Sequence, residues 1–233
     1  MTATALWGAD GIRNPIARFF AVLLRRYGPQ HWWPADTPLE VIVGAILTQS
    51  TAWTNVEKAI ANLKRAGMLS ARGLEALPEA DLARLIRPSG YYNQKAKKLK
   101  VFLEYLRRRH RGSLARMFRL PASQLRGELL ELHGIGEETA DSILLYAGGR
   151  PAFVVDAYTR RIARRHGLIE ASSSRHPASY HDIQALFERH LPRRAAVYNE
   201  FHALLVETGK RHCFRRDPQC AGCPLEPFPH RVD

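Results

Sequence analysis

Long apolar runs, cysteines and strand-like patterns are all scarce in this chain of 233 residues. No apolar run approaches the roughly 20 residues that a helix needs to cross a bilayer. The first residues lack the basic start and apolar stretch of a secretory signal, so we expect a cytoplasmic protein without a membrane partner. Regular alternation of polar and apolar residues is missing too, and helical periodicity takes its place. The sequence therefore predicts an all-α fold.

Only three cysteines are present, and all of them lie in one short segment near the end of the sequence. An odd number of cysteines in a cytoplasmic chain does not build a disulfide framework. Cys213, Cys220 and Cys223 follow the spacing C-x6-C-x2-C in a tail rich in proline. Such a segment has little apolar material of its own to order it, and it indicates metal binding.

Acidic residues are also few relative to basic ones. The chain has 35 Lys and Arg against 22 Asp and Glu, which gives a formal net charge of +13. The basic residues gather in the segments YYNQKAKKLK, LRRRHRG, YTRRIARRHG and GKRHCFRR. This clustering favours a polyanionic partner, above all nucleic acid, over a basic surface that serves only solubility.

The helical pattern divides the chain into segments that end at recognisable caps. Asn14 and Thr37 each precede a proline at the first helical position, and Gly67 follows a helix as a C-cap. Asp156 can cap the segment after it. We expect helices over residues 15–28, 38–50, 55–67, 71–78, 78–88, 93–112, 121–132, 138–149, 157–167, 180–192 and 194–210.

Two glycines separate the helices expected at 121–132 and 138–149. Gly134 and Gly136 flank one apolar residue and allow backbone angles that a Cβ would forbid. The turn can then present the amides of the next helix to a phosphate oxygen. The alternative is an ordinary turn between two helices with a glycine cap.

Five stretches in this order give the chain a specific resemblance: EVIVGAILTQST, GYYNQKAKKLK, ELHGIGEETADSILLYA, FVVDAYTRRIARRHGL and the cysteine tail. Together they resemble the endonuclease III group of helix-hairpin-helix DNA glycosylases, from about residue 28 to residue 223. The resemblance implies two helical domains with a cleft for an extruded base. We expect a six-helix barrel with the hairpin at 37–149 and a second helical domain from 1–36 and 150–233. Residues 211–230 are expected to form an iron–sulfur loop.

The resemblance also implies an acid at the reacting sugar. Asp156 matches the catalytic aspartate of the family, although a plain N-cap is the other interpretation. Members that also cut the strand carry a lysine two residues after the second hairpin glycine. Glu138 stands there instead, and the sequence has no lysine between Lys100 and Lys210. A carboxylate forms no imine, which speaks against a lyase step. Glu138 serves either as a favourable acid in the first turn of a helix or in positioning water.

Within the family, HWWPADTP, LTQSTAW and GYYNQKAKKLK look most like the 3-methyladenine DNA glycosylase III branch and its endonuclease III-related neighbours. That resemblance implies a base pocket with aromatic and proline faces at Trp33, Pro34 and Trp53. An N-methylated purine is a cation, and stacking on Trp stabilises it by roughly 0.5–2 kcal/mol. The alternative places the tryptophans in the core or in an interface.

Several further residues match family positions that touch DNA. Gln49 matches a residue that fills the gap left by the flipped base, although a polar residue at a helix end would also explain it. Asn93, Gln94 and Lys95 open a basic helix that faces the DNA backbone or the minor groove, or else only solvent. The expected DNA-binding residues are Gln49, Asn93, Lys95, Gly134, Gly136 and Thr139.

The family resemblance implies that the cysteine tail binds a [4Fe–4S] cluster. Cys213, Cys220 and Cys223 would hold three irons, but the fourth cysteine position is Pro229. His230, His212, a hydroxide or a carboxylate can supply the fourth ligand. A decaying site that binds zinc or nothing is the alternative.

The sequence thus favours a monofunctional glycosylase that removes an alkylated purine such as 3-methyladenine in base excision repair. Its partner is double-stranded DNA that contains a damaged base or an abasic site, and we expect a nucleoid-associated monomer. Two other functions stay open: a bifunctional glycosylase and lyase on oxidised pyrimidines, and a catalytically weak protein that binds damaged DNA.

Overall fold

The computed structural model describes residues 14–169 and 178–232, which are helical and connected by short turns and loops. No strand is found among these residues, so the all-α prediction is confirmed. The chain divides into two compact units. The first joins the residues up to Trp32 to those from Pro151 onward, and the second spans Trp33–Arg150. The boundaries expected from the sequence follow residues 36 and 149.

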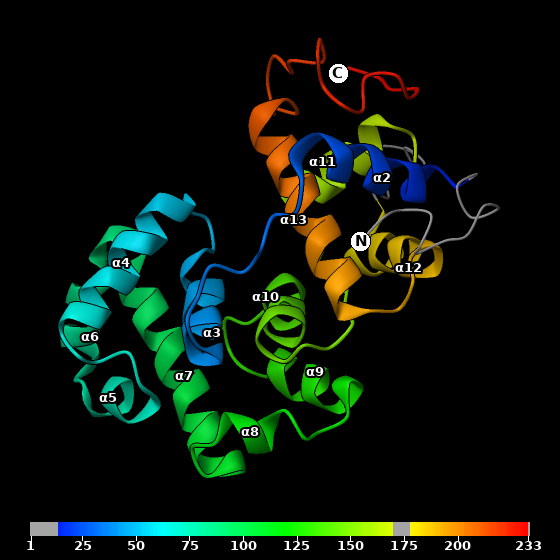
Figure 1. Ribbon diagram of the computed structural model, residues 1–233. Helices are drawn as coiled ribbons and strands as arrows, with labels where there is room; N and C mark the ends of the chain where they lie inside the picture. The colour runs from blue at the N-terminus through cyan, green and yellow to red at the C-terminus, as the bar shows by residue number, and fades with distance from the viewer. Residues whose placement is uncertain (1–13, 170–177, 233) are drawn as a thin grey trace. The chain divides into compact units, whose positions relative to one another are not determined.

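The first unit packs its helices around an aromatic core. Its helices are α2 (Pro15–Tyr27), α11 (Ala157–Arg165), α12 (Tyr180–His190) and α13 (Ala195–Arg211). Helix α13 contacts both α11 and α2 (Figure 1). Phe153 and Phe187 stack with their ring centroids 4.5 Å apart, and Phe201 meets Phe187 edge to face. Burial of large aromatic side chains supplies much of the stability of a helical unit of this size.

The second unit is built around two central helices, α3 and α7. It contains α3 (Pro38–Leu47), α4 (Trp53–Arg65), α5 (Ala71–Ala76), α6 (Glu79–Leu85), a 3-10 turn (Arg87–Ser89), α7 (Tyr92–His110), α8 (Leu114–Met117), α9 (Ala122–Leu130), α10 (Glu137–Ser142) and a π turn (Ile143–Ala147). Every residue of α3 from Leu39 to Leu47 is buried. Helix α7 contacts α5, α6, α8 and α3 (Figure 1).

The caps expected from the sequence are present. The side chains of Asn14, Thr37 and Asp156 each accept a hydrogen bond from a backbone N–H in the first turn of α2, α3 and α11. Gly67 follows α4 with φ +67°, a left-handed angle that suits glycine. One expected helix differs, because residues 138–149 begin as α10 and continue as the π turn Ile143–Ala147.

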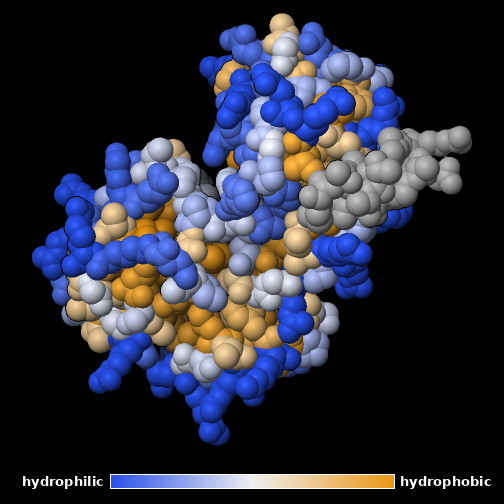
Figure 2. Space-filling model, viewed as in Figure 1, coloured by the Kyte–Doolittle hydropathy of each residue, from blue (hydrophilic) through white to orange (hydrophobic). Residues whose placement is uncertain are grey.

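The surface of both units is rich in charge. In Figure 2 hydrophilic residues cover much of the visible face of each unit. None of the helices among the described residues has the length and apolar character that crossing a membrane requires.

Candidate active site

The hairpin expected at Gly134 and Gly136 connects α9 to α10. Gly134 has φ +87° and therefore needs to be glycine, whereas Gly136 has an extended backbone with φ −94° that any residue can adopt. The expectation that both glycines hold special backbone angles is thus wrong for Gly136. A Cβ at Gly136 would meet nothing within 4 Å. Its lack of a side chain leaves the start of α10 open to another molecule.

An ion pair ties the two hairpin helices together. Arg126 of α9 donates from Nε and Nη2 to the two carboxylate oxygens of Asp141 in α10, at 2.7 and 3.0 Å. The Asp141 side chain is fully buried, and that of Arg126 is 26% exposed. A bidentate pair of this kind fixes the angle between the helices as well as their distance.

Gln49 fastens the hairpin to the end of α3. Its Nε2 donates to the carbonyl of Gly134 and to Oγ1 of Thr139, both at 3.0 Å. Its Oε1 accepts from Nζ of Lys98 at 2.5 Å. The structure thus brings together Gln49, Gly134 and Thr139, three of the expected DNA-binding residues, and it adds Lys98. In this conformation both ends of the Gln49 amide are engaged within the protein.

Lys98 also explains why position 134 is glycine. A Cβ at Gly134 would lie 2.6 Å from the side-chain carbons of Lys98. Thr139 is 6% exposed, so its hydroxyl serves the Gln49 contact inside the unit. Thr139 and Lys98 therefore contact the hairpin on the side that faces the interior of the unit. Gly136 and the residues beside it form the exposed side of the hairpin.

The structure corrects the expected role of Lys95. Its side chain is buried at 2% exposure, and Nζ donates to the carbonyls of Leu47 and Ser89 at 2.8 and 2.7 Å. Burial, with a smaller effect from Lys98, lowers the pKa of Lys95 to about 8. The ammonium joins the end of α3 to the 3-10 turn, and it is not available to a phosphate.

The start of α7 carries the exposed polar group that was expected, together with an unexpected tyrosine. Asn93 is exposed in the first turn, as is Gln94. Tyr91 precedes the helix with φ +44°, an angle that costs free energy for a residue with a Cβ. Its side chain is 69% exposed. Strained backbone and an exposed aromatic ring often coincide at functional positions, and nothing in the sequence marked Tyr91 as one.

The expected pocket residues Trp33 and Trp53 lie together in the second unit. Their ring centroids are 5.2 Å apart and their planes cross at 86°. Two perpendicular rings in contact cannot hold a flat base between parallel faces, so a base would stack on one face only. Tyr146 of the π turn adds a third ring, 5.0 Å from Trp33. Pro34 is exposed beside this aromatic cluster.

Packing holds the aromatic cluster in place. The ring of Trp33 covers Gly44 of α3, where a Cβ would come within 3.2 Å of it. Nε1 of Trp53 donates to Oε1 of Glu57 at 2.9 Å. Trp33, Trp53 and Tyr146 are each partly exposed, so the cluster is neither core nor open surface. Tyr146 lies more than 90 residues from Trp53 in sequence, which hid it from sequence reasoning.

Asp156 lies in the first unit and caps α11. Its Oδ1 accepts from the backbone N–H of Thr159 at 2.7 Å. Its Oδ2 lies 3.8 Å from Nε2 of His202 on α13, and 14% of the Asp156 side chain is exposed. Burial lowers the pKa of His202, against a smaller opposing effect of Asp156. An imidazole whose pKa lies below its ordinary value is therefore next to a carboxylate that is partly exposed.

Glu138 is exposed in the first turn of α10, together with Glu137. An acid at this place is favourable because the helix N-terminus carries partial positive charge. The Lys98 ammonium lies close to the hairpin but is hydrogen-bonded to Gln49. The place where the resemblance leads us to expect the family lysine thus carries a carboxylate that water can reach.

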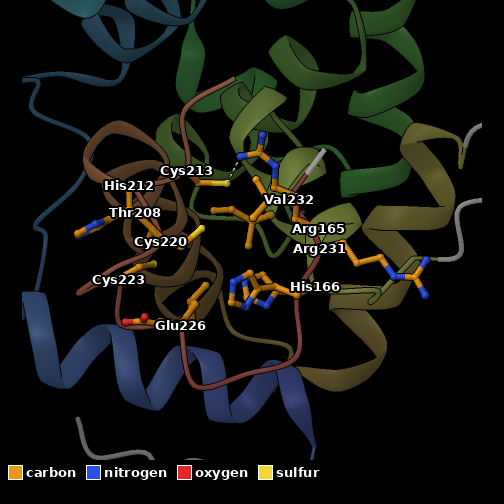
Figure 3. A pocket seen from close by; sticks show the side chains of 13 residues that line it. Arg165, His166, Thr208, His212, Cys213, Cys220, Cys223, Glu226, Arg231 and Val232 are labelled. Carbon is orange, nitrogen blue, oxygen red and sulfur yellow. Dashed lines mark hydrogen bonds between the residues drawn. The ribbon is translucent and has the colours of Figure 1, made fainter. Parts of the chain in front are cut away.

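The cysteine tail folds back on α11 and α13 of the first unit. Cys213, Cys220 and Cys223 line one cavity together with His166, His212, Glu226 and His230 (Figure 3). Nη1 of Arg165 donates to Sγ of Cys213 at 3.2 Å. Burial raises the pKa of the Cys223 thiol, while hydrogen bonds from the backbone N–H groups of Leu225 and Glu226 oppose that rise.

Within the described ranges, no three His, Cys, Asp or Glu side chains converge closely enough to enclose a single metal ion. Three thiols lie on one cavity wall, and N–H groups are directed at two of the sulfurs.

This helical chain is strongly basic and has a glycine hairpin with an accessible helix start. These features are typical of helical proteins that bind the DNA backbone, a contact that does not read the base sequence. Comparison of the chain with known proteins identifies the family within this class. A family model described as HhH-GPD superfamily base excision DNA repair protein matches residues 43–190. The chain belongs to this superfamily and is a DNA glycosylase of base excision repair.

Similar proteins carry related names. A candidate DNA repair glycosylase of Methanocaldococcus jannaschii is 45% identical over 91% of this chain and 94% of its own length. Endonuclease III of Thermotoga maritima is 31% identical over 88% of this chain and 87% of its own. The solved structure of a Helicobacter pylori 3-methyladenine DNA glycosylase bound to 1,N6-ethenoadenine has a TM-score of 0.71 at 29% identity. The match covers 84% of this chain and 97% of that one.

Proposed function

We propose that this glycosylase is monofunctional and hydrolyses the N-glycosidic bond of an alkylated purine, such as 3-methyladenine, in double-stranded DNA. The observation that carries the proposal is Asp156. Its carboxylate is fixed by Thr159, partly exposed and accompanied by the buried His202. A fixed carboxylate of this kind can stabilise positive charge that develops on a sugar and orient an attacking water.

The reaction follows from these groups. The C1′–N bond breaks and its electron pair neutralises the cationic purine, so the base leaves without a strong acid. Asp156 stabilises the oxocarbenium-like sugar, and a water adds to C1′ and releases a proton. The product is an abasic site in an intact strand. No step requires an amine, in keeping with Glu138 at the place of the family lysine.

The aromatic cluster supports the choice of an alkylated purine. Trp33, Trp53 and Tyr146 offer a partly exposed aromatic surface, and stacking of a cationic base on such a surface is favourable by roughly 0.5–2 kcal/mol. Extrusion of a damaged base from the duplex also costs less free energy than extrusion of a normal base, because the pairing of the damaged base is already weakened. The similarity to a 3-methyladenine glycosylase at 29% identity points the same way.

The open hairpin surface at Gly136 and the exposed Asn93 would hold the DNA backbone. Binding then depends on the release of counterions from phosphates. The logarithm of the affinity is expected to fall with the logarithm of the salt concentration, with a slope of about −0.9 for each phosphate neutralised. A flat salt dependence would contradict binding through the basic surface.

The cysteine loop fits a [4Fe–4S] cluster, with Cys213, Cys220 and Cys223 as three of its ligands. The cluster would order the tail and add no step to base removal. Arg215 and Arg216, which are exposed in the same loop, would then meet phosphates. Iron and sulfide analysis of anaerobically purified protein tests the assignment.

A bifunctional lyase on oxidised pyrimidines is the second candidate, and the Lys98 ammonium near the hairpin is the observation in its favour. A screen of duplexes with alkylated purines, oxidised pyrimidines and mismatched thymine separates the candidates when base release and strand scission are measured independently. Release of alkylated purines without scission supports the proposal. Scission at oxidised pyrimidines supports the lyase, and binding without release on every duplex supports a non-catalytic protein.

A further inference from the structure

The cluster proposed above lacks one protein ligand, because proline replaces the fourth cysteine at position 229. The structure shows what lies beside that proline. The carbonyl of Pro229 is 3.0 Å from Nδ1 of His166, a residue at the end of α11 and more than 60 positions earlier in the chain. His166 also lines the cavity that holds the three cysteines (Figure 3).

We propose that Nε2 of His166 binds the fourth iron of a [4Fe–4S] cluster held by the three cysteines. The inference rests on the proposed cluster and extends it. Its basis is the place of His166: the imidazole lines the cysteine cavity and is joined through Nδ1 to the very position where a fourth cysteine is expected.

The surroundings of His166 prepare it as a ligand. A metal-binding histidine usually donates its other ring N–H to a carbonyl, which fixes the tautomer and the ring orientation. The Nδ1 contact with Pro229 is of this kind and leaves the lone pair on Nε2 for iron. Nε2 forms no hydrogen bond with any residue that the structure describes. The ring of Phe19 meets the imidazole edge to face at 4.9 Å and limits its rotation.

The other donors on the cavity wall are less suited. His230 is exposed, its Nδ1 contacts the carbonyl of Phe228 only two residues away, and its ring lies 5.5 Å from that of His166. Nδ1 of His212 contacts the carbonyl of Gln219, and His212 adjoins Cys213. Oε2 of Glu226 accepts from the backbone N–H of Gly222. His166 and His212 each follow the last residue of a helix, α11 and α13, but of the two only His166 contacts the carbonyl of Pro229.

An imidazole ligand changes the cluster in a measurable way. Thiolate carries a negative charge and neutral imidazole does not, so the cluster gains one unit of positive charge relative to four-cysteine ligation. Replacement of cysteine by histidine raises the reduction potential of iron–sulfur centres. Arg165, which donates to Cys213, adds positive charge on the same side. The potential of this cluster should therefore lie above that of the His166→Cys variant.

The test is spectroscopic and uses the full chain with nitrogen-15 in its histidines, purified anaerobically and then reduced with dithionite, because the cluster carries an electron spin only after one-electron reduction. The expected result is a paramagnetic cluster whose electron spin couples to one histidine nitrogen. This coupling disappears in His166→Ala and persists in the matched control His230→Ala. The His166→Cys variant is expected to hold a four-iron cluster that lacks the nitrogen coupling and has a lower reduction potential than the wild-type cluster.

Each other outcome has a definite meaning. A wild-type cluster without histidine coupling overturns ligation by His166, although the cluster itself stands. A coupling that survives in His166→Ala has the same meaning. Loss of the coupling only in His230→Ala assigns the ligand to His230 instead. Wild-type protein without iron or sulfide overturns the cluster and this inference together, while the glycosylase proposal stands on Asp156. If His166→Ala does not fold, His166→Cys decides: a four-iron cluster without nitrogen coupling supports ligation by His166, and a coupling that persists overturns it.

Discussion

Oδ1 of Asp156 accepts a hydrogen bond from the backbone N–H of Thr159 at 2.7 Å, so the proposed catalytic carboxylate is also the N-cap of α11. The two roles use different oxygens, since Oδ2 faces His202. Capping alone requires only an acceptor, whereas charge stabilisation requires the negative charge. Substitutions at position 156 can therefore separate folding from chemistry.

Asp156→Asn is expected to abolish base release while the protein stays folded. Asn caps helices about as well as Asp, so the free energy of unfolding should change little. Asp156→Ala removes the cap too and should cost about 1 kcal/mol of stability. Urea unfolding and single-turnover base release measure the two effects. Near wild-type release by Asp156→Asn would show that Asp156 is only a cap.

Lys95 predicts a characteristic pH dependence of stability. Its pKa in the folded protein is about 8, below the value near 10.4 of an exposed lysine. Between these values the unfolded chain binds more protons than the folded one, so the contribution of Lys95 to stability rises with pH across this window and is constant below it. The wild type should therefore gain stability relative to Lys95→Met between about pH 8 and pH 10.

Urea unfolding at several pH values tests this, with the exposed Lys97→Met as the matched control. Lys97→Met should follow the wild type in parallel throughout the window. If Lys95→Met also runs parallel to the wild type, the buried ammonium does not titrate as described.

Arg126 and Asp141 predict a large loss of stability from a single change. Arg126→Met leaves the fully buried carboxylate of Asp141 without its bidentate partner. Removal of one member of a buried ion pair costs about 3 kcal/mol or more. Arg84→Met is the control, because the Arg84–Asp81 pair is exposed and should contribute less than about 1 kcal/mol. Equal losses in the two variants would contradict the bracing role of Arg126.

Tyr91 predicts a defect in DNA binding without a defect in folding. Its ring is exposed and makes no large contribution to the core. An exposed aromatic ring can stack on or insert between bases, and such contacts contribute about 1–3 kcal/mol. Tyr91→Ala should weaken binding to lesion-bearing duplex by about tenfold, and Tyr91→Phe should bind as the wild type does. Titration of a labelled duplex measures both; unchanged affinity in Tyr91→Ala would remove Tyr91 from the DNA surface.

Local signals in the sequence predicted the helices well, because caps and apolar periodicity act over a few residues. Asn14, Thr37 and Asp156 are caps that could be read directly. The buried Lys95 was within reach as well, since it lies four residues before Leu99 and seven before Phe102, on the buried face of α7. The density of basic residues around it hid this periodicity.

Contacts between distant segments could not be read from the sequence. Tyr146 meets Trp33 through the π turn, and a local widening of the helix has no sequence signature in this chain. His202 reaches Asp156 from α13, and His166 reaches Pro229 from α11. Each depends on how whole helices pack, which single-residue patterns do not specify.

The central claim is that base removal proceeds through the Asp156 carboxylate and involves no covalent amine. One assay addresses it: a duplex with a single alkylated purine is incubated with the enzyme and analysed for free base, for strand breaks with and without alkali, and for adducts trapped by borohydride. The account predicts free base, strands that break only in alkali, and no trapped adduct. Strand breaks without alkali, together with a borohydride adduct that disappears in Lys98→Gln, would contradict it.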